Sequence, residues 1–200
     1  MRLTSQGEQY KAFPSEGTDR IVTQMPLLIR NLRYPISTVE LMEQRIKASS
    51  SRDQELKNSW LKNYFFTGDG RARRKDGRLK ILLDSEELRK ITPDKILVYG
   101  AILQSDELYS QEGIELTPEE VDKYGGSGFS KDVVLNNRIW RILARHPDEV
   151  PKHLARDPNL LKEYVNLVFS QFDQAMGIYP GPNEDALRPW HVVRVGYGSG

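Results

Sequence analysis

The stretch DPNLLKEYVNLVFSQFDQAMG, residues 157–177, decides the fold of this 200-residue chain. Asp157 is a good N-cap, Pro158 suits the first turn of a helix, and Gly177 suits the left-handed position after the last turn. At roughly 100° per residue, the apolar side chains fall within an arc of about 200°, whereas a surface helix needs an apolar stripe of only about 100°. The pattern therefore predicts a helix over 157–177 that is covered on more than one side.

Three other segments are predicted to pack against this helix. A second helix is predicted over 130–145, where Ser130 is a suitable N-cap and one side is apolar. The segments KILVYGAIL (95–103) and WHVVRVGY (190–197) are apolar enough to form strands. The sequence thus predicts an α+β fold, in which a small mixed or antiparallel sheet packs on a C-terminal helical core.

A hairpin is predicted to complete the sheet. Asp76-Gly77 lies between two extendable runs, and both residues tolerate the positive φ of a tight hairpin turn. We therefore expect a β-hairpin over 70–84. The glycine-rich segment 124–129, which precedes the helix predicted over 130–145, is expected to be a flexible loop.

The first 36 residues are polar and interrupted by proline and glycine, with one apolar island at 25–29. Pro26 makes a long helix there unfavourable. We expect an extended N-terminal arm (1–36) whose island docks on the body of the domain or on a neighbouring subunit. Ser37-x-x-Glu40 is a capping box, so a single α+β domain (37–200) is expected to begin with a helix.

The composition limits the classes of function. The formal net charge is +1, from 29 Lys and Arg against 28 Asp and Glu, which argues against a surface that binds nucleic acid on all sides. The chain has no cysteine, which excludes disulfides, thiolate zinc sites and a cysteine nucleophile. No apolar run approaches the roughly 18 residues of a membrane span, and no signal peptide is recognisable. We expect a cytoplasmic protein, or a virion protein if the chain is virus-encoded, with no membrane partner.

Two groups of basic residues are candidate sites for nucleic acid or another anion. The hairpin contributes Arg71, Arg73, Arg74, Lys75, Arg78 and Lys80. Arginine matches phosphate geometry, and a two-stranded ribbon can lie in a nucleic-acid groove. The helix predicted over 130–145 places Lys131, Arg138, Arg141 and Arg145 within about 80° of one face. The alternative is that these residues are solvated, or that the hairpin pairs with the acidic segment 106–122.

Histidine chemistry is the weakest candidate. His146 and His153 lack the i,i+4 spacing of a helical zinc pair. His191 could act as a base oriented by Glu184 or Asp185, but no nucleophile motif accompanies it. We therefore predict no catalytic residue, metal or cofactor.

Three functions remain, in order of preference. The first is a non-enzymatic assembly or adaptor protein that self-associates or binds a protein partner through its N-terminal arm and its patches of opposite charge. It would be a structural component of a larger viral or nucleoprotein complex. The second is a nucleic-acid-binding accessory protein that uses the basic hairpin (71–80) and the basic face of the helix predicted over 130–145. The third is a hydrolase that uses His191.

Overall fold

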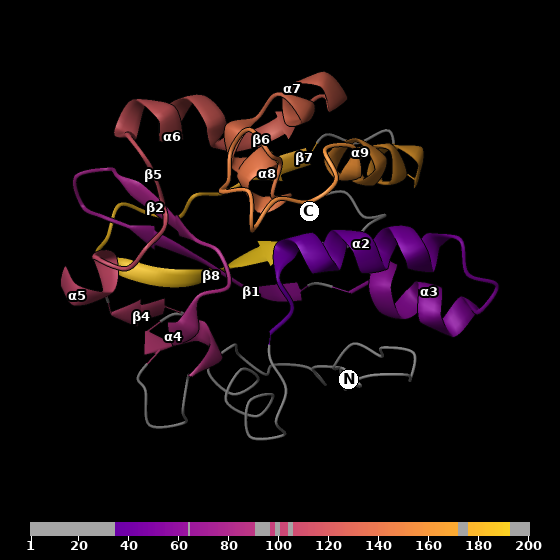
Figure 1. Cartoon of the computed structure of the whole chain (residues 1–200), viewed down its shortest axis with the longest axis horizontal. Coiled ribbons are helices and arrows are strands. Elements are labelled where there is room, and N and C mark those ends of the chain that lie inside the picture. The colour runs from indigo at the N-terminus through magenta and orange to yellow at the C-terminus, as the bar shows by residue number, and fades with distance from the viewer. Residues whose placement is uncertain are drawn as a thin grey trace.

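The computed structural model describes residues 35–63, 65–90, 97–98, 101–103, 106–171 and 176–192 (Figure 1). The strands are β1 Phe65–Arg73, β2 Leu79–Leu82, β3 Leu97–Val98, β4 Ala101–Leu103, β5 Ile114–Leu116, β6 Gly126–Phe129, β7 Met176–Ile178 and β8 Ala186–Val192. The helices are α2 Thr38–Ser49, α3 Gln54–Leu61, α4 Glu86–Arg89, α5 Asp106–Tyr109, α6 Pro118–Tyr124, α7 Lys131–Leu135, α8 Arg138–Leu143 and α9 Leu160–Gln171. The arm predicted over 1–36 lies outside the described residues, except for its last two.

The strands form a six-stranded sheet in the order β3-β4-β8-β1-β2-β5 and a two-stranded sheet of β6 and β7. All described strand pairs are antiparallel. The predicted hairpin is present, since β1 and β2 pair directly and Gly77 adopts a φ of 91° in the turn between them. The α+β class with an antiparallel sheet is therefore confirmed.

The strand register divides the side chains of the large sheet between two faces. Residues that lie opposite each other point to the same side, and alternate residues point to opposite sides. The inner face carries Arg71, Arg73, Leu79, Ile81, Leu116, Arg188 and Trp190. The outer face carries Ala72, Lys80, Glu115 and Leu187. This division places the basic residues of the hairpin on both sides of the sheet.

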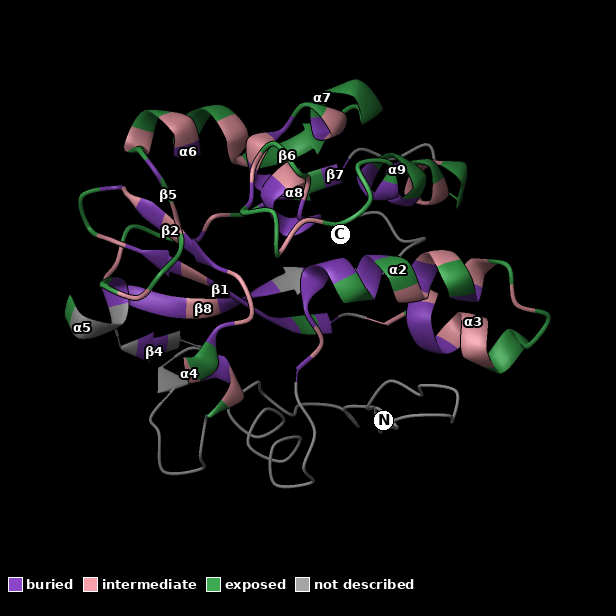
Figure 2. Ribbon diagram, viewed as in Figure 1, coloured by how far each residue is buried: buried purple, intermediate pink, exposed green. Residues whose placement is uncertain are grey.

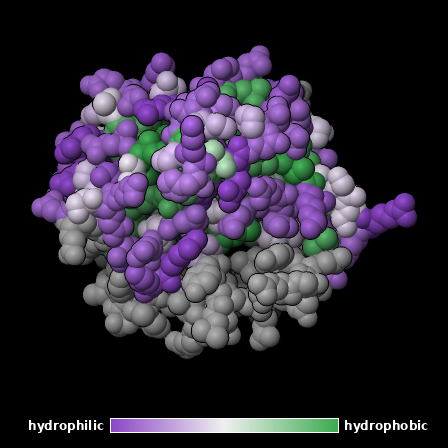
Figure 3. Space-filling model, in the orientation of Figure 1, coloured by the Kyte–Doolittle hydropathy of each residue, from purple (hydrophilic) through white to green (hydrophobic). Residues whose placement is uncertain are grey.

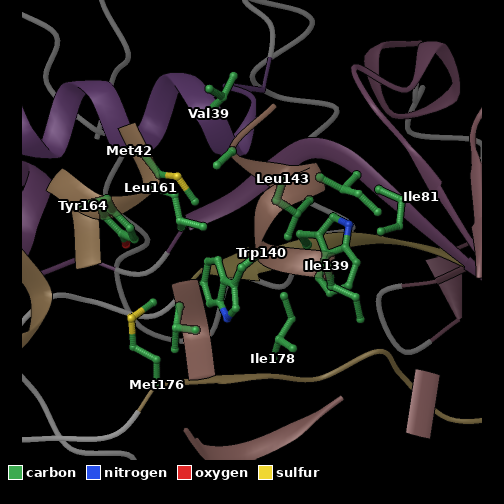
Figure 4. Packing of buried hydrophobic residues seen from close by; sticks show 14 of the residues in the cluster. Val39, Met42, Ile81, Ile139, Trp140, Leu143, Leu161, Tyr164, Met176 and Ile178 are labelled. Carbon is green, nitrogen blue, oxygen red and sulfur yellow. The ribbon is translucent and has the colours of Figure 1, made fainter. Parts of the chain in front are cut away.

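The main core lies between the inner face and the helices. Figure 4 shows Val39 and Met42 of α2, Ile81 of β2, Ile139, Trp140 and Leu143 of α8, Leu161 and Tyr164 of α9, and Met176 and Ile178 of β7 packed together. In Figure 2, β1, β2 and β8 are mostly buried, while α6, α7 and α9 turn an exposed side outward. The core thus joins both ends of the described chain.

The helix predicted over 130–145 is wrong as a single helix, because α7 and α8 are separate. Asn136 is the C-cap of α7, and Asn137 is the N-cap of α8. Its Oδ1 accepts a hydrogen bond from the Trp140 amide at 3.2 Å, and its Nδ2 donates to the Tyr124 carbonyl at 2.7 Å. Asparagine offers the backbone this alternative to a continuous helix, which is why it favours caps over helix interiors.

The helix predicted over 157–177 begins later than expected, at Leu160, and it ends before Met176, which lies in β7. It is α9, and residues 172–175 lie outside the described part of the chain. Gly177 is not a left-handed cap, because it lies in β7 and pairs with β6. A Cβ on Gly177 would lie 2.9 Å from the Gly126 carbonyl oxygen, so glycine is needed for the close approach of β6. The segment predicted as a loop over 124–129 is therefore largely a strand.

The strands predicted over 95–103 and 190–197 also differ from the observed ones. The run 95–103 contains two short strands, β3 and β4, that pair antiparallel with each other. An apolar run does not reveal a reversal inside it. The strand predicted over 190–197 is β8, which begins earlier at Ala186, and residues 193–200 lie outside the described part. Within the described residues, no helix is both long enough and apolar enough to cross a lipid bilayer.

Candidate functional site

The basic hairpin is not a free ribbon. In the six-stranded sheet β1 also pairs with β8, and β2 also pairs with β5. Both edges of the hairpin are therefore occupied along these pairings. The hairpin cannot enter a nucleic-acid groove as a two-stranded element, and its basic residues must be judged face by face.

On the outer side, the hairpin cations gather around the ring of Tyr109. The charged groups of Arg74, Lys80 and Arg78 lie 4.4, 4.6 and 5.6 Å from the ring centroid. Burial raises the pKa of Tyr109 to about 12, which keeps the phenol neutral.

Carboxylates neutralise these cations. The closest pairs are Arg74–Asp106 at 3.0 Å, Lys75–Asp185 at 3.5 Å, Arg78–Asp76 at 2.7 Å and Lys80–Glu115 at 3.8 Å. Two of the four carboxylates belong to the acidic segment 106–122. The hairpin therefore pairs with that segment inside the molecule, as the alternative interpretation of the sequence allowed. Head-to-tail assembly through these two segments would first have to break these pairs.

The four basic residues predicted to share a helical face are divided, since Arg138 and Arg141 both contact Glu149, at 3.1 and 3.4 Å, whereas Arg145 is buried. Arg138 is paired with Glu120 and with Glu149 at 3.1 Å, and Arg141 is paired with Asp148 at 2.7 Å. Lys131 is exposed in the first turn of α7.

Arg145 lies in the interior, with 2% of its surface exposed. Its Nη2 lies 2.6 Å from the Asp84 carboxylate and 3.5 Å from that of Asp69, which is fully buried. Burial raises the pKa of Asp69, and the positive charge of Arg145 opposes that effect. Arg145 therefore forms part of the buried interior and is not available to a polyanion.

The inner face presents a different cluster, which we call the arginine cluster: Arg71, Arg73 and Arg188. Arg71 lies directly opposite Arg188 across β1 and β8. Arg73 donates from Nε and Nη2 to the Asn183 side-chain oxygen at 2.8 and 2.5 Å. Arg188 is bonded to Glu184. Among the described residues, Glu184 is the one carboxylate that forms an ion pair with a member of this cluster.

A turn after β7 covers the arginine cluster. Arg71 donates to the carbonyl of Tyr179, and its guanidinium lies 5.5 Å from the Tyr179 ring and 5.4 Å from the Trp190 ring. The Tyr179 ring is nevertheless 66% exposed. Gly181 adopts a φ of 93°, which bends the turn back over Arg71. The aromatic side chain of Tyr179 is thus held at the surface against the half-buried Arg71.

The electrostatics of the arginine cluster are unfavourable. Burial, reinforced by the charge of Arg188, lowers the pKa of Arg71 to about 10. Burial also lowers the pKa of Arg73 and of Arg188. These shifts mean that the charged form of each guanidinium is less well stabilised here than in water.

The predicted histidine site is not assembled in the described part of the chain. The backbone of His191 lies in β8 opposite Phe66, and its side chain lies outside the described part. The two carboxylates predicted to orient His191 form ion pairs with other residues, Glu184 with Arg188 and Asp185 with Lys75. The described residues contain no group of three or more His, Asp or Glu side chains that could hold a metal ion.

Sequence reasoning missed Arg188, Tyr179, Trp190 and Asn183 as neighbours of Arg71 and Arg73. The available signal was the alternation of Arg188 and Trp190 in β8, which places both on one face of a strand.

Comparisons with known proteins bear on the fold. No protein-family model matches the chain, and a search of curated proteins finds no match. One solved structure, described as "Accommodation of massive sequence variation in Nanoarchaeota by the C-type lectin fold", resembles it with a TM-score of 0.56. The two sequences are 12% identical, and the match covers 86% of this chain and 83% of that chain. The chain therefore resembles the C-type lectin fold, and at this identity the likeness concerns the fold alone.

Proposed function

We propose that this chain is a non-enzymatic assembly or adaptor protein whose contact surface is centred on Tyr179. The observation that carries the proposal is the exposed Tyr179 ring, stacked on Arg71 above the buried Trp190. Tyrosine, tryptophan and arginine are the residues most enriched at the energetic centres of protein interfaces. A ring held by buried neighbours loses little conformational freedom when a partner covers it.

The distribution of charge supports a protein partner over a polyanion. Carboxylates pair with four basic residues of the hairpin, Arg74, Lys75, Arg78 and Lys80. They also pair with Arg138, Arg141 and Arg145. Binding of a nucleic acid would have to break these pairs or use the few cations outside them. Figure 3 shows a mostly hydrophilic face with hydrophobic residues in separate small areas, which offers no broad apolar patch on that side.

A second copy of the chain is the partner that we propose. Asp132 in α7 and Glu163 in α9 are exposed, and neither has an ion-pair partner among the described residues. Such carboxylates could approach the arginine cluster of a neighbouring molecule in a heterologous contact. The arm predicted over 1–36 remains a second proposed contact, and the absence of cysteine favours a setting in the cytoplasm or a virion.

The structural neighbour is consistent with a binding role. Its description attributes to the C-type lectin fold the capacity to accommodate massive sequence variation. A fold of that kind keeps one framework while the residues on it change. We propose the same division here, with the core as framework and the turn around Tyr179 as the recognition surface.

Sedimentation velocity over a wide range of protein concentration tests this proposal. We expect reversible self-association that Tyr179→Ala weakens by at least roughly tenfold, because truncation of a central aromatic residue typically costs about 2 kcal/mol. Phe66→Ala is the matched control, since Phe66 is also an exposed aromatic residue, at 38%, but lies on β1, away from Tyr179 and from the proposed carboxylates of α7 and α9. A wild-type chain that stays monomeric at every concentration would contradict the proposal, as would equal weakening by both variants.

A further inference from the structure

Two like charges face each other across the centre of the sheet. Arg71 and Arg188 are direct partners on β1 and β8, and both point to the inner face. Like charges in this position destabilise a sheet. Glu184 compensates Arg188, and no carboxylate of the described residues forms an ion pair with Arg71. The pair therefore keeps one positive charge without a matching negative charge.

Hydrogen-bond donors at the same place also lack partners. Arg71 Nε and Trp190 Nε1 are buried and have no acceptor among the described residues. The Arg71 guanidinium lies 5.4 Å from the Trp190 ring centroid, so these two groups are neighbours. Arg73 Nη1, two residues along the same face of β1, is buried without an acceptor as well. Nearly all buried polar groups in folded proteins are paired, so unpaired donors beside an uncompensated charge indicate a missing acceptor.

The other charge clusters differ in their carboxylates, although a buried donor without an acceptor also occurs there, at Arg145 Nε. Arg78 on the outer side contacts Asp76 and Glu115 at 2.7 and 3.3 Å. Arg145 in the core contacts two aspartates. In the cluster at Arg71, by contrast, the one carboxylate, Glu184, is paired with Arg188, and Arg71 forms no ion pair with a described carboxylate although it is half-buried.

We propose that Arg71, Arg188 and the Trp190 indole N–H form a binding site for one small oxyanion, a phosphate or carboxylate group. Guanidinium groups match both in geometry, and a single negative charge balances the pair. The ring of Tyr179 contacts the Arg71 guanidinium from the turn, so an entering anion competes with this contact. The oxyanion then replaces the contact between this ring and Arg71.

Anion-dependent thermal unfolding tests the site. The melting temperature is measured with increasing sodium phosphate, sulfate or acetate, with sodium chloride keeping the ionic strength constant. We expect a rise that grows with the logarithm of the concentration and reaches about 3–6 °C at ten times the dissociation constant of the oxyanion that fits, relative to chloride. The order of phosphate, sulfate and acetate shows whether the site takes a tetrahedral or a planar group.

Variants separate this site from a general salt effect. Arg71→Gln should abolish the rise specific to the oxyanion, and its melting temperature in chloride should equal or exceed that of wild type because the repulsion from Arg188 is gone. Arg78→Gln, on the outer side, should keep the rise. If Arg71→Gln does not fold, Arg188→Gln gives the same test from the opposite strand.

The indole N–H signal gives a second readout. In a ¹H–¹⁵N spectrum assigned with Trp190→Phe, the Trp190 indole signal should shift on titration with the anion, and the signals of Trp60 and Trp140 should stay. The proposal is overturned if no oxyanion differs from chloride, or if Arg71→Gln responds like wild type. It does not rest on the proposed self-association: Tyr179→Ala should weaken self-association and retain anion binding.

Discussion

The buried ion pair between Arg145 and Asp69 allows the sharpest test of how this chain is held together. Arg145→Met keeps the length and apolar character of the side-chain stem and removes the guanidinium. Asp69, which has no exposed surface, would then lose its buried cation. Its remaining partners would be the backbone amides of Thr38 at 2.7 Å and Asp84 at 2.9 Å.

The size of the effect follows from these contacts. Removal of one partner from a buried ion pair typically costs about 3–5 kcal/mol. The two amide hydrogen bonds to Asp69 remain, which favours the lower half of that range. Asp84 is partly exposed and keeps Arg89 at 3.0 Å, so its contribution is small. We therefore expect a loss of about 3–4 kcal/mol in the free energy of unfolding, or about 6–16 °C in melting temperature.

Urea unfolding followed by tryptophan fluorescence measures this loss, and its pH dependence gives a second check. Burial raises the folded-state pKa of Asp69, and removal of Arg145 takes away the charge that opposes that rise. A raised pKa contributes stability below the unfolded value of about 3.9, and that stability is lost as pH rises through the folded value. The deficit of Arg145→Met should therefore shrink as the pH falls from neutral toward about 4.

Arg141→Met is the matched control. Arg141 pairs with Asp148, whose side chain is 71% exposed, and lies 3.4 Å from Glu149, which keeps Arg138 as a partner, so the loss of Arg141 should cost about 1 kcal/mol. A deficit for Arg145→Met no larger than that of Arg141→Met would refute the placement of Arg145 in the core. A deficit that grows on acidification would refute the role assigned to Asp69.

Three further predictions concern the hairpin, the turn and the break between α7 and α8. Arg74→Glu should change the affinity for single-stranded DNA at low salt by less than about threefold, because Arg74 is already paired with Asp106. If the variant instead loses strong, salt-dependent binding in a filter or fluorescence assay, Arg74 contacts phosphate. Gly77→Ala should lower stability to urea by about 1–2 kcal/mol, since φ is 91° and the new Cβ would lie 3.2 Å from Pro118; an unchanged midpoint would contradict the turn geometry. Asn137→Ala should lower stability by about 1–2 kcal/mol, because it removes the α8 cap and the bond to the Tyr124 carbonyl, whereas the exposed Asn136→Ala should cost less.

Local patterns in the sequence predicted the features that local chemistry controls. The Asp76-Gly77 turn gave the hairpin, and Ser37 and Glu40 form the expected capping box at the start of α2. The apolar arc of α9 correctly identified a helix that packs into the core. These features depend on residues within a few positions of one another, so a single sequence contains the information.

Features that depend on contacts between distant residues could not be predicted. Arg74 and Asp185 lie on one surface because β1 pairs with β8, and no spacing in the sequence reveals that register. Arg188 is a single arginine in an apolar strand, so a search for runs of basic residues passes over it. Helical periodicity over 130–145 places Arg145 on an exposed face, but α8 ends at Leu143 and Arg145 adopts a left-handed φ of 55°.

Hydrogen exchange at low and high protein concentration tests the central claim most directly, because it locates the contact surface in the unmodified chain. The proposed function predicts that raising the concentration slows exchange in peptides covering 176–185, and that Tyr179→Ala removes this protection. Protection elsewhere with no change at 176–185, or protection that persists unchanged in Tyr179→Ala, would contradict it.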